Sequence, residues 1–211
     1  MATINRGILG GFSGRVANVV GSSWKGIATM RALPLSVLNP RTAAQVGNRT
    51  RFSLLSILAA AILTTIVKPL NDRFASAMSG YNLFTSRCKE AFNVAGIFVP
   101  ANLTLSSGKL GDPVISSTVA HVDGTGEVTF PAFAVGAYEQ TTDKAYAVLL
   151  NASGEVLAVS SGEIARDFGS ITFDIDGGLA LGSHVHFYLS FLRADGTIVS
   201  NSAHADITVV A

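Results

Sequence analysis

The chain has 211 residues, of which 48% are hydrophobic and 14% are charged. An average soluble domain carries roughly 25% charged residues, so this chain has too little charge to cover a free monomer, and we expect part of its surface to meet other subunits or lipid. The single cysteine, Cys88, excludes an internal disulfide framework. Residues 1–20 contain Arg6, Arg15 and many glycines but no continuous apolar stretch, so no secretory signal peptide is expected.

The net charge of +1 hides a division of charge along the chain. Residues 1–99 contain eleven Lys or Arg and two acidic residues, whereas residues 100–211 contain four Lys or Arg and twelve acidic residues. This asymmetry favours an acidic partner for the first half. The candidates are nucleic acid, anionic lipid and the second half of a neighbouring copy.

Residues 4–35 are predicted to form short strands with glycine turns. The segments 15–20 and 24–31 flank a Gly-Ser-Ser stretch, which is typical of a β-hairpin with a short loop. The frequent glycines weaken isolated strands and let another backbone approach closely. Residues 22–26 lack the glycine spacing of a phosphate-binding loop.

Asn39 and Pro40 are typical of a helix start, and the sequence predicts a helix from Arg41 to Val67. Its sixteen consecutive uncharged residues, 52–67, are fewer than the about 20 that span a membrane. Because this helix is apolar on every side, we expect it to be buried or intersubunit and covered on all sides. Membrane contact is the alternative.

Pro69 is expected to end the first helix, and residues 70–93 are expected to form a second one. Gly80 interrupts its apolar periodicity and Gly96 ends it. Two adjacent helices joined at a proline predict an antiparallel α-helical hairpin. Cys88 lies in the second helix and is interpreted as a small buried hydrophobe.

Charge sign and periodicity both change at Val99 and Pro100, so we place a domain boundary there. Residues 1–99 are predicted to be a basic assembly region and residues 100–211 an acidic domain. About seven alternating segments separated by Asp-Gly and Ser-Gly turns are typical of an immunoglobulin-like β-sandwich, here without a disulfide. The expected strands are 114–121, 127–130, 144–150, 155–160, 170–175, 184–192 and 203–210. The expected fold class is α+β: an N-terminal β-hairpin and an α-helical hairpin, followed by an all-β immunoglobulin-like sandwich.

No pattern of catalytic or metal-binding residues stands out. His184 and His186 project from one face of a strand, but His121 and His204 are far away in sequence, so a polar sheet face or an intersubunit contact explains the pair better than a metal site. Residues 174–178 resemble the opening of a calcium loop without its later ligands, and a turn explains them better. The sequence has no Gly-x-Ser-x-Gly, His-Glu-x-x-His or Cys-x-x-Cys element. We therefore expect no enzymatic activity, no cofactor and no metal.

Nucleic-acid binding is a weaker possibility for the basic half. Trp24 and Phe12 are able to stack on bases, but the cations are spread among glycines and turns rather than clustered. Pairing of these cations with acidic groups of a neighbouring subunit is the favoured interpretation.

Several motifs in the first half resemble those of one family. They are Ser13-Gly14-Arg15-Val16, Val19-Val20-Gly21, Trp24-Lys25-Gly26, Arg31, Asn39-Pro40-Arg41-Thr42-Ala43-Ala44-Gln45, Arg51-Phe52 and Tyr81-Asn82. They are similar to the SGKVG…VVG…WKG…R…NPKT-x-AQ signature of an uncharacterised family common in Bacteroidetes and their phages, whose members end in a β-rich domain. Arginine replaces the usual lysine at positions 15 and 41 and preserves the charge. The resemblance covers residues 1–95 and implies a phage- or prophage-associated protein, with no catalytic residues to transfer.

These observations predict a non-enzymatic, self-assembling structural protein: a bacteriophage virion subunit of the capsid, tail or surface lattice, made in the bacterial cytoplasm. Its expected partners are copies of itself and other virion proteins. Trp24, Lys25, Arg31 and Arg41 are the residues expected at subunit contacts. The alternatives are a surface or receptor-binding module whose sandwich loops contact a host glycan or protein, and a membrane-associated virion protein that uses residues 52–67.

Overall fold

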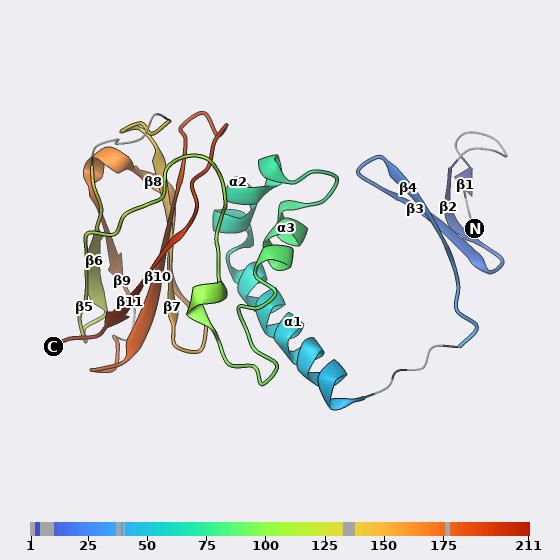
Figure 1. Ribbon diagram of the computed structural model, residues 1–211, viewed down its shortest axis with the longest axis horizontal. Helices are drawn as coiled ribbons and strands as arrows, with labels where there is room; N and C mark the ends of the chain where they lie inside the picture. Colours follow the sequence, from blue (N-terminus) through green and yellow to red (C-terminus); the bar gives the residue numbers. More distant parts are fainter. Residues whose placement is uncertain (1–2, 5–10, 37–38, 40, 133–137, 176–177) are drawn as a thin grey trace. The chain divides into compact units, whose positions relative to one another are not determined.

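The computed structural model describes residues 3–4, 11–36, 39, 41–132, 138–175 and 178–211. The chain divides into two compact units, each described by itself below. The first comprises Met1–Thr42 with Ser76–Met78, and the second comprises Ala43–Ala75 with Ser79–Ala211. The fold is mixed, with helices and mostly antiparallel sheets (Figure 1).

The first unit contains a four-stranded antiparallel sheet in chain order, larger than the expected hairpin. Its strands are β1 (Thr3–Ile4), β2 (Phe12–Val16), β3 (Val19–Trp24) and β4 (Ile27–Ala32). The expected Gly-Ser-Ser loop lies inside β3, because Gly21 pairs with both Gly14 and Met30. The turn between β3 and β4 is instead formed by Lys25 and Gly26, with φ of 47° and 83°. Positive φ at both central residues is what a two-residue hairpin turn of type I′ requires.

The predicted helix 41–67 is broken near its end. An α-helix, α1, spans Ala43–Ala61, and a π-helical turn follows at Leu63–Val67. Backbone amides of Ile66 and Val67 both donate to the carbonyl of Ile62, at 3.0 Å each. Among the described residues no single helix meets the length and hydropathy that crossing a bilayer requires, and α1 with residues 63–74 meets them only as a pair bent by 72°.

The second predicted helix is shorter than expected. A short helix α2 (Lys68–Asn71) and a 3₁₀ turn (Asp72–Phe74) precede α3 (Gly80–Arg87). Pro69 lies in the first turn of α2, where a missing amide costs nothing. Gly80 does not interrupt the helix but begins it, since the Ser79 hydroxyl caps α3 by accepting from the Asn82 amide at 3.2 Å.

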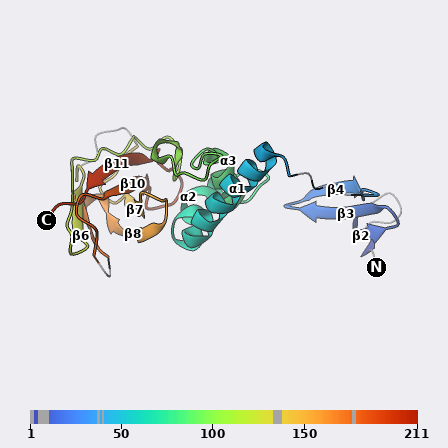
Figure 2. The same ribbon diagram turned by 90° about the horizontal axis from the view of Figure 1, so that it is seen from below.

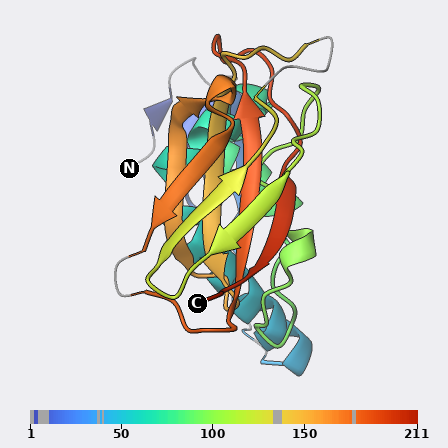
Figure 3. The same ribbon diagram turned by 90° about the vertical axis from the view of Figure 1, so that its left-hand side faces the viewer.

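The C-terminal half contains two antiparallel sheets, in agreement with the predicted β-rich second half (Figure 3). The three-stranded sheet has the order β5-β6-β9 and the four-stranded sheet the order β11-β10-β7-β8. Their bounds are β5 Ser117–Ala120, β6 Thr125–Thr129, β7 Lys144–Asn151, β8 Val156–Ala165, β9 Ser170–Asp174, β10 His184–Leu192 and β11 Ala203–Thr208. Each strand overlaps one of the seven predicted segments.

Three layers make up the second unit, because helices cover the outer face of the four-stranded sheet (Figure 2). In β10, Tyr188 and Leu192 join the core shared with α1 and α3, whereas Leu189 and Phe191 join the core between the two sheets. β10 is therefore buried on both faces from Val185 to its end. The helices share a core with the sheet, so the predicted boundary at residue 99 falls inside this unit and the division of the chain lies near residue 42.

Candidate interaction surfaces

The N-terminal sheet has no buried apolar core in the part that the structure describes. The buried hydrophobic side chains begin at Leu55, and every residue of β4 is exposed. Met30 is 70% exposed and Trp24 is 57% exposed. A sheet gains stability when a hydrophobic face packs on another layer. The exposed apolar side chains of this sheet therefore make it a candidate interaction surface.

One face of the sheet, here the basic face, carries the positive charge. Arg15 is the partner of Val20 in β3, and Val20 is in turn the partner of Arg31 in β4, so the two arginines flank one valine. The Ser22 and Thr29 hydroxyls hydrogen-bond to each other at 2.7 Å on this face. The register gives the basic face as Arg15, Val20, Ser22, Trp24, Ile27, Thr29 and Arg31.

The opposite face, here the apolar face, is uncharged in the register of the described strands. Alternation along the strands gives it Phe12, Gly14, Val16, Val19, Gly21, Ser23, Ala28, Met30 and Ala32. The Phe12 ring crosses Gly21 so closely that a Cβ there would lie 2.7 Å from it. Val16 is half exposed, and Met30 protrudes into solvent. The missing side chain of Gly21 thus makes room for Phe12 of the neighbouring strand.

Three of the four predicted contact residues belong to the β3–β4 hairpin. Trp24 and Arg31 lie on the basic face, and Lys25 lies in the adjacent turn. Within the same unit, the Lys25 ammonium donates to the backbone carbonyl of Met78. Arg41 is exposed and lies in the segment before α1, outside the sheet.

A second exposed apolar surface lies on α1, so this helix is not covered on all sides within the second unit, and its covering by another subunit stays a prediction. Phe52 and Ile57 are 60% and 65% exposed. The loop beside α1 adds Val94 and Ile97, which are 61% and 62% exposed. The four-stranded sheet and α3 pack against the other side of α1, around Leu55. Together they cover that side of the helix and not the side that carries Phe52 and Ile57.

A groove of about 430 Å³ runs between α1 and the turn from β7 to β8. Gly96 packs on the helix here, since a Cβ would lie 3.3 Å from Leu54. Glu155 is the one charged residue among the described groove residues. The lining residues are Leu54, Ile57, Leu58, Ala61, Phe92, Gly96, Ser153, Gly154, Glu155 and Val156. This is an apolar groove with one acidic group.

Pairing of β10 with β11 brings histidines together that are distant in sequence. The His204 Nε2 and His186 Nδ1 atoms are 3.3 Å apart, and His184 Nδ1 is 3.0 Å from Asp206 Oδ1. Burial lowers the pKa of both His186 and His204, with Asp206 acting in the opposite direction. The His204 ring also stacks on Tyr188. Sequence reasoning missed this cluster, because only the register places His204 beside His186.

The described residues hold no group of three or more His, Cys, Asp or Glu arranged to bind a metal ion. Two residues of the calcium-like segment, Asp176 and Gly177, lie outside the described residues. Asp174, at its start, ends β9 and is exposed. The described part of this segment therefore begins as the end of a strand.

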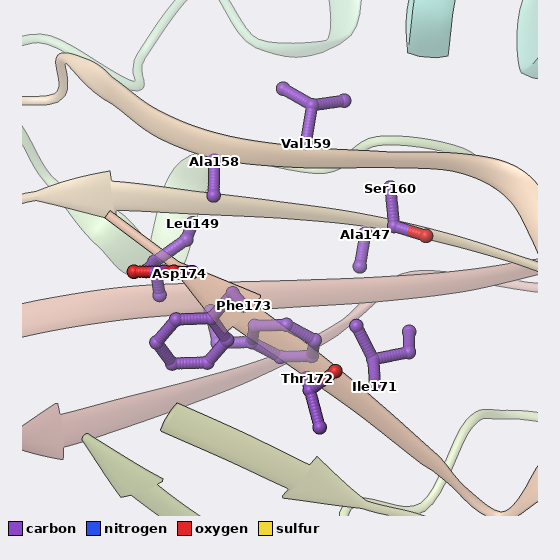
Figure 4. Close-up of a pocket in the computed structure, with 10 residues that line it drawn as sticks. Ala147, Leu149, Ala158, Val159, Ser160, Ile171, Thr172, Phe173 and Asp174 are labelled. Atoms are coloured by element: carbon purple, nitrogen blue, oxygen red, sulfur yellow. The ribbon is translucent and has the colours of Figure 1, made fainter. Parts of the chain in front are cut away.

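A small pocket of about 220 Å³ opens between the edges of β8 and β9 (Figure 4). β8 contributes Ala158, and β9 contributes Ile171 and Phe173 from the other sheet. Asp174 is the one titratable side chain among the described residues that line it. Ser160 and Thr172 add hydroxyl groups to its lining.

Buried charge is concentrated at one end of the sandwich. The Arg166 guanidinium lies 3.9 Å from the centre of the Phe191 ring and 3.6 Å, through Nε, from Asp143 Oδ2. Burial raises the pKa of Asp143, and Arg166 opposes that shift. Asp143 also accepts from the Gln140 amide at 2.8 Å. These contacts tie the segment before β7 to the turn after β8, which is a structural role.

The chain belongs to the Family of unknown function (DUF6266), whose model matches residues 11–206. None of the curated proteins compared with the chain matches it. Three solved structures are similar to about half of it. CopC from Methylosinus trichosporium OB3b is 18% identical over 46% of this chain and 93% of that chain, with a TM-score of 0.30. Rat CD45 extracellular domains d3–d4 are 11% identical over 49% and 51%, and the adhesin domain of Epf from Streptococcus pyogenes is 13% identical over 48% and 33%, each with a TM-score of 0.34.

Proposed function

We propose that this member of the DUF6266 family is a non-enzymatic structural subunit that assembles with copies of itself. The observation that carries the proposal is the N-terminal sheet, which exposes Val16, Trp24 and Met30 and has no buried apolar side chain among its described residues. Only 14% of the residues are charged, so we expect the chain to be poorly soluble unless a partner covers this exposed apolar surface.

We place the assembly in a bacteriophage virion, as a capsid, tail or surface-lattice subunit. The similarity of residues 13–45 to a signature found in Bacteroidetes and their phages supports this location. Membership in a family of unknown function does not identify which virion component the chain forms. The basic face then meets acidic groups of neighbouring subunits.

Trp24 gives a direct test, because it is the only tryptophan and is 57% exposed. The purified chain is followed by light scattering and by tryptophan emission over a range of protein and salt concentrations. We expect the mass to rise with protein concentration while the emission shifts to the blue, and both changes to weaken in high salt. A monomer with unshifted emission at every concentration overturns the proposal. Assembly that occurs only with detergent or lipid vesicles overturns it in favour of a membrane role.

A further inference from the structure

We infer that protonation of His186 releases residues 92–103, here the covering segment, from the outer face of the four-stranded sheet. The covering segment and the sheet both belong to the second unit, so this pH-sensitive opening takes place within one unit. The inference goes beyond the proposed function, because a monomer and an assembly would both show the opening.

The covering segment packs directly on β10. The centres of the Phe98 and His186 rings are 5.9 Å apart, and the Tyr188 hydroxyl donates to the carbonyl of Pro100 at 2.8 Å. Phe92 packs against Phe98 with ring centres 5.3 Å apart, and both belong to the core that includes Tyr188. His186 is therefore only 8% exposed. A charge on its ring has little access to water while the covering segment is in place.

The neighbouring ring of His204 adds a second restriction. His186 Nδ1 and His204 Nε2 are 3.3 Å apart, so in the neutral pair one of these nitrogens carries a hydrogen and the other accepts it. A first proton binds a ring nitrogen outside this hydrogen bond and leaves it intact. A second proton places an N–H group on both facing nitrogens and breaks the bond. Two charged rings this close also repel each other.

One carboxylate on the same face partly offsets the charge. Asp206 Oδ1 is 3.7 Å from His186 Nδ1 and stabilises the charged ring, whereas His184 has the opposite effect. Asp206 is exposed and also binds His184 at 3.0 Å. Burial is the largest influence on the pKa of His186, and it lowers that pKa. Lifting the covering segment removes this influence.

The other elements around the ring contribute little charge. The covering segment contains no Asp, Glu, Lys, Arg or His, and the β7 partner of His186 is Leu150. In the turn after β7, Glu155 accepts from the side-chain amide of Asn151 at 2.7 Å. The thiol of Cys88, just after α3, donates to the carbonyl of Thr104. Exposure of the ring to water is thus the main way to stabilise its charge.

The size of the effect follows from linkage. The open form takes up a proton near the ordinary histidine pKa of about 6.5, whereas the closed form stays neutral. The stability of the closed form is therefore complete above about pH 6.5 and is lost as the pH falls below it. For one proton, the equilibrium constant for opening rises by about tenfold between pH 7.5 and pH 5.5.

Native-state hydrogen exchange, corrected for the intrinsic effect of pH, tests this opening at pH 7.5 and pH 5.5. The amides of Val99 and Leu103, which donate to the carbonyls of Ala91 and Pro100, report on the covering segment. The amides of β7 report on the sheet. We expect the covering segment to be less protected than β7 at both pH values, and its protection to fall by about tenfold at pH 5.5.

His186→Gln keeps a hydrogen-bonding side chain that takes up no proton, and it is expected to abolish the fall in protection. His204→Gln leaves the buried ring in place and is expected to reduce the fall. His121→Gln, in the segment just after β5 of the other sheet, is the control and is expected to behave like the wild type.

Three results overturn the inference. One is a covering segment that is as well protected as β7 at both pH values, because it then opens only when the whole unit unfolds. Another is a wild type whose covering segment keeps its protection at pH 5.5. The last is a fall in protection that persists in folded His186→Gln or, if that variant does not fold, a fall that His204→Gln leaves unchanged.

Discussion

Leu189→Ala tests whether the helices and the sandwich unfold as one unit. Leu189 is fully buried in β10 and packs in the core between the two sheets. Truncating a buried leucine costs about 2–5 kcal/mol, through lost apolar burial and the cavity left behind. Because the four-stranded sheet also packs on the helices, we expect the whole second unit to lose this stability.

The thiol of Cys88 reports the opening of the helical layer. It is buried, belongs to the core on the other side of the sheet and lies 3.1 Å from the carbonyl oxygen of Thr104, to which it donates. Burial raises the pKa of this thiol, so the native protein is expected to react with a thiol reagent only after unfolding. A loss of about 2–5 kcal/mol then speeds the labelling by roughly 30-fold to several thousand-fold.

The labelling rate of Cys88 is measured in native buffer beside a urea unfolding curve from circular dichroism. Leu181→Ala, at an exposed position, is the control and is expected to change both by little. If Leu189→Ala destabilises the strands while the labelling rate stays at the wild-type value, the helices and the sandwich are separate units. The domain boundary would then belong at residue 99 after all.

Three further substitutions probe the second unit by urea denaturation. Arg166→Met leaves the carboxylate of Asp143 buried without its cation and is expected to cost about 3–5 kcal/mol; an unchanged midpoint refutes the role of the pair. Burial lowers the pKa of His186, so the unfolded chain takes up a proton below about pH 6.5 while the folded chain stays neutral, and stability falls as the pH falls below about 6.5. His186→Phe should reduce that dependence, and an equally steep dependence counts against it. Ser79→Ala removes the cap of α3 and should cost about 1 kcal/mol, whereas Ser86→Ala, at an exposed site in α3, should cost little.

The strands of the sandwich could be predicted closely because their signals are local. Alternating side chains and Asp-Gly or Ser-Gly turns define each segment, and the prediction 144–150 differs from β7 by one residue. Turns such as the one at Gly154, with a φ of 82°, need a residue that tolerates left-handed backbone. The residues of the turn itself are therefore enough to predict its position.

The features that depend on tertiary packing could not be predicted. Neither proline nor glycine marks the break after Ala61, where the chain forms a π-helical turn. The predicted turn at residues 21–23 is wrong, because Gly21 is a typical loop residue, although here the Phe12 ring needs a glycine beneath it inside the strand. The charge change at residue 99 suggested a boundary, but charge describes the surface and a shared core defines the unit.

Because β10 is buried on both faces, the alternation of apolar and polar side chains that usually sets the alignment of a strand with its neighbours is missing. A strand with one apolar and one polar face resists a shift by one residue, because the shift would expose its apolar side chains. Here both faces are buried, and a shift would exchange the side chains of one core for those of the other. Hydrogen bonds of buried serines fix the alignment of the strand instead. Ser106 donates to Ser190 at 2.9 Å, and Ser200 accepts from the Phe191 amide at 2.8 Å. These two hydrogen bonds thus do for the central sheet what alternation does for an exposed one, and a shifted strand would break both of them.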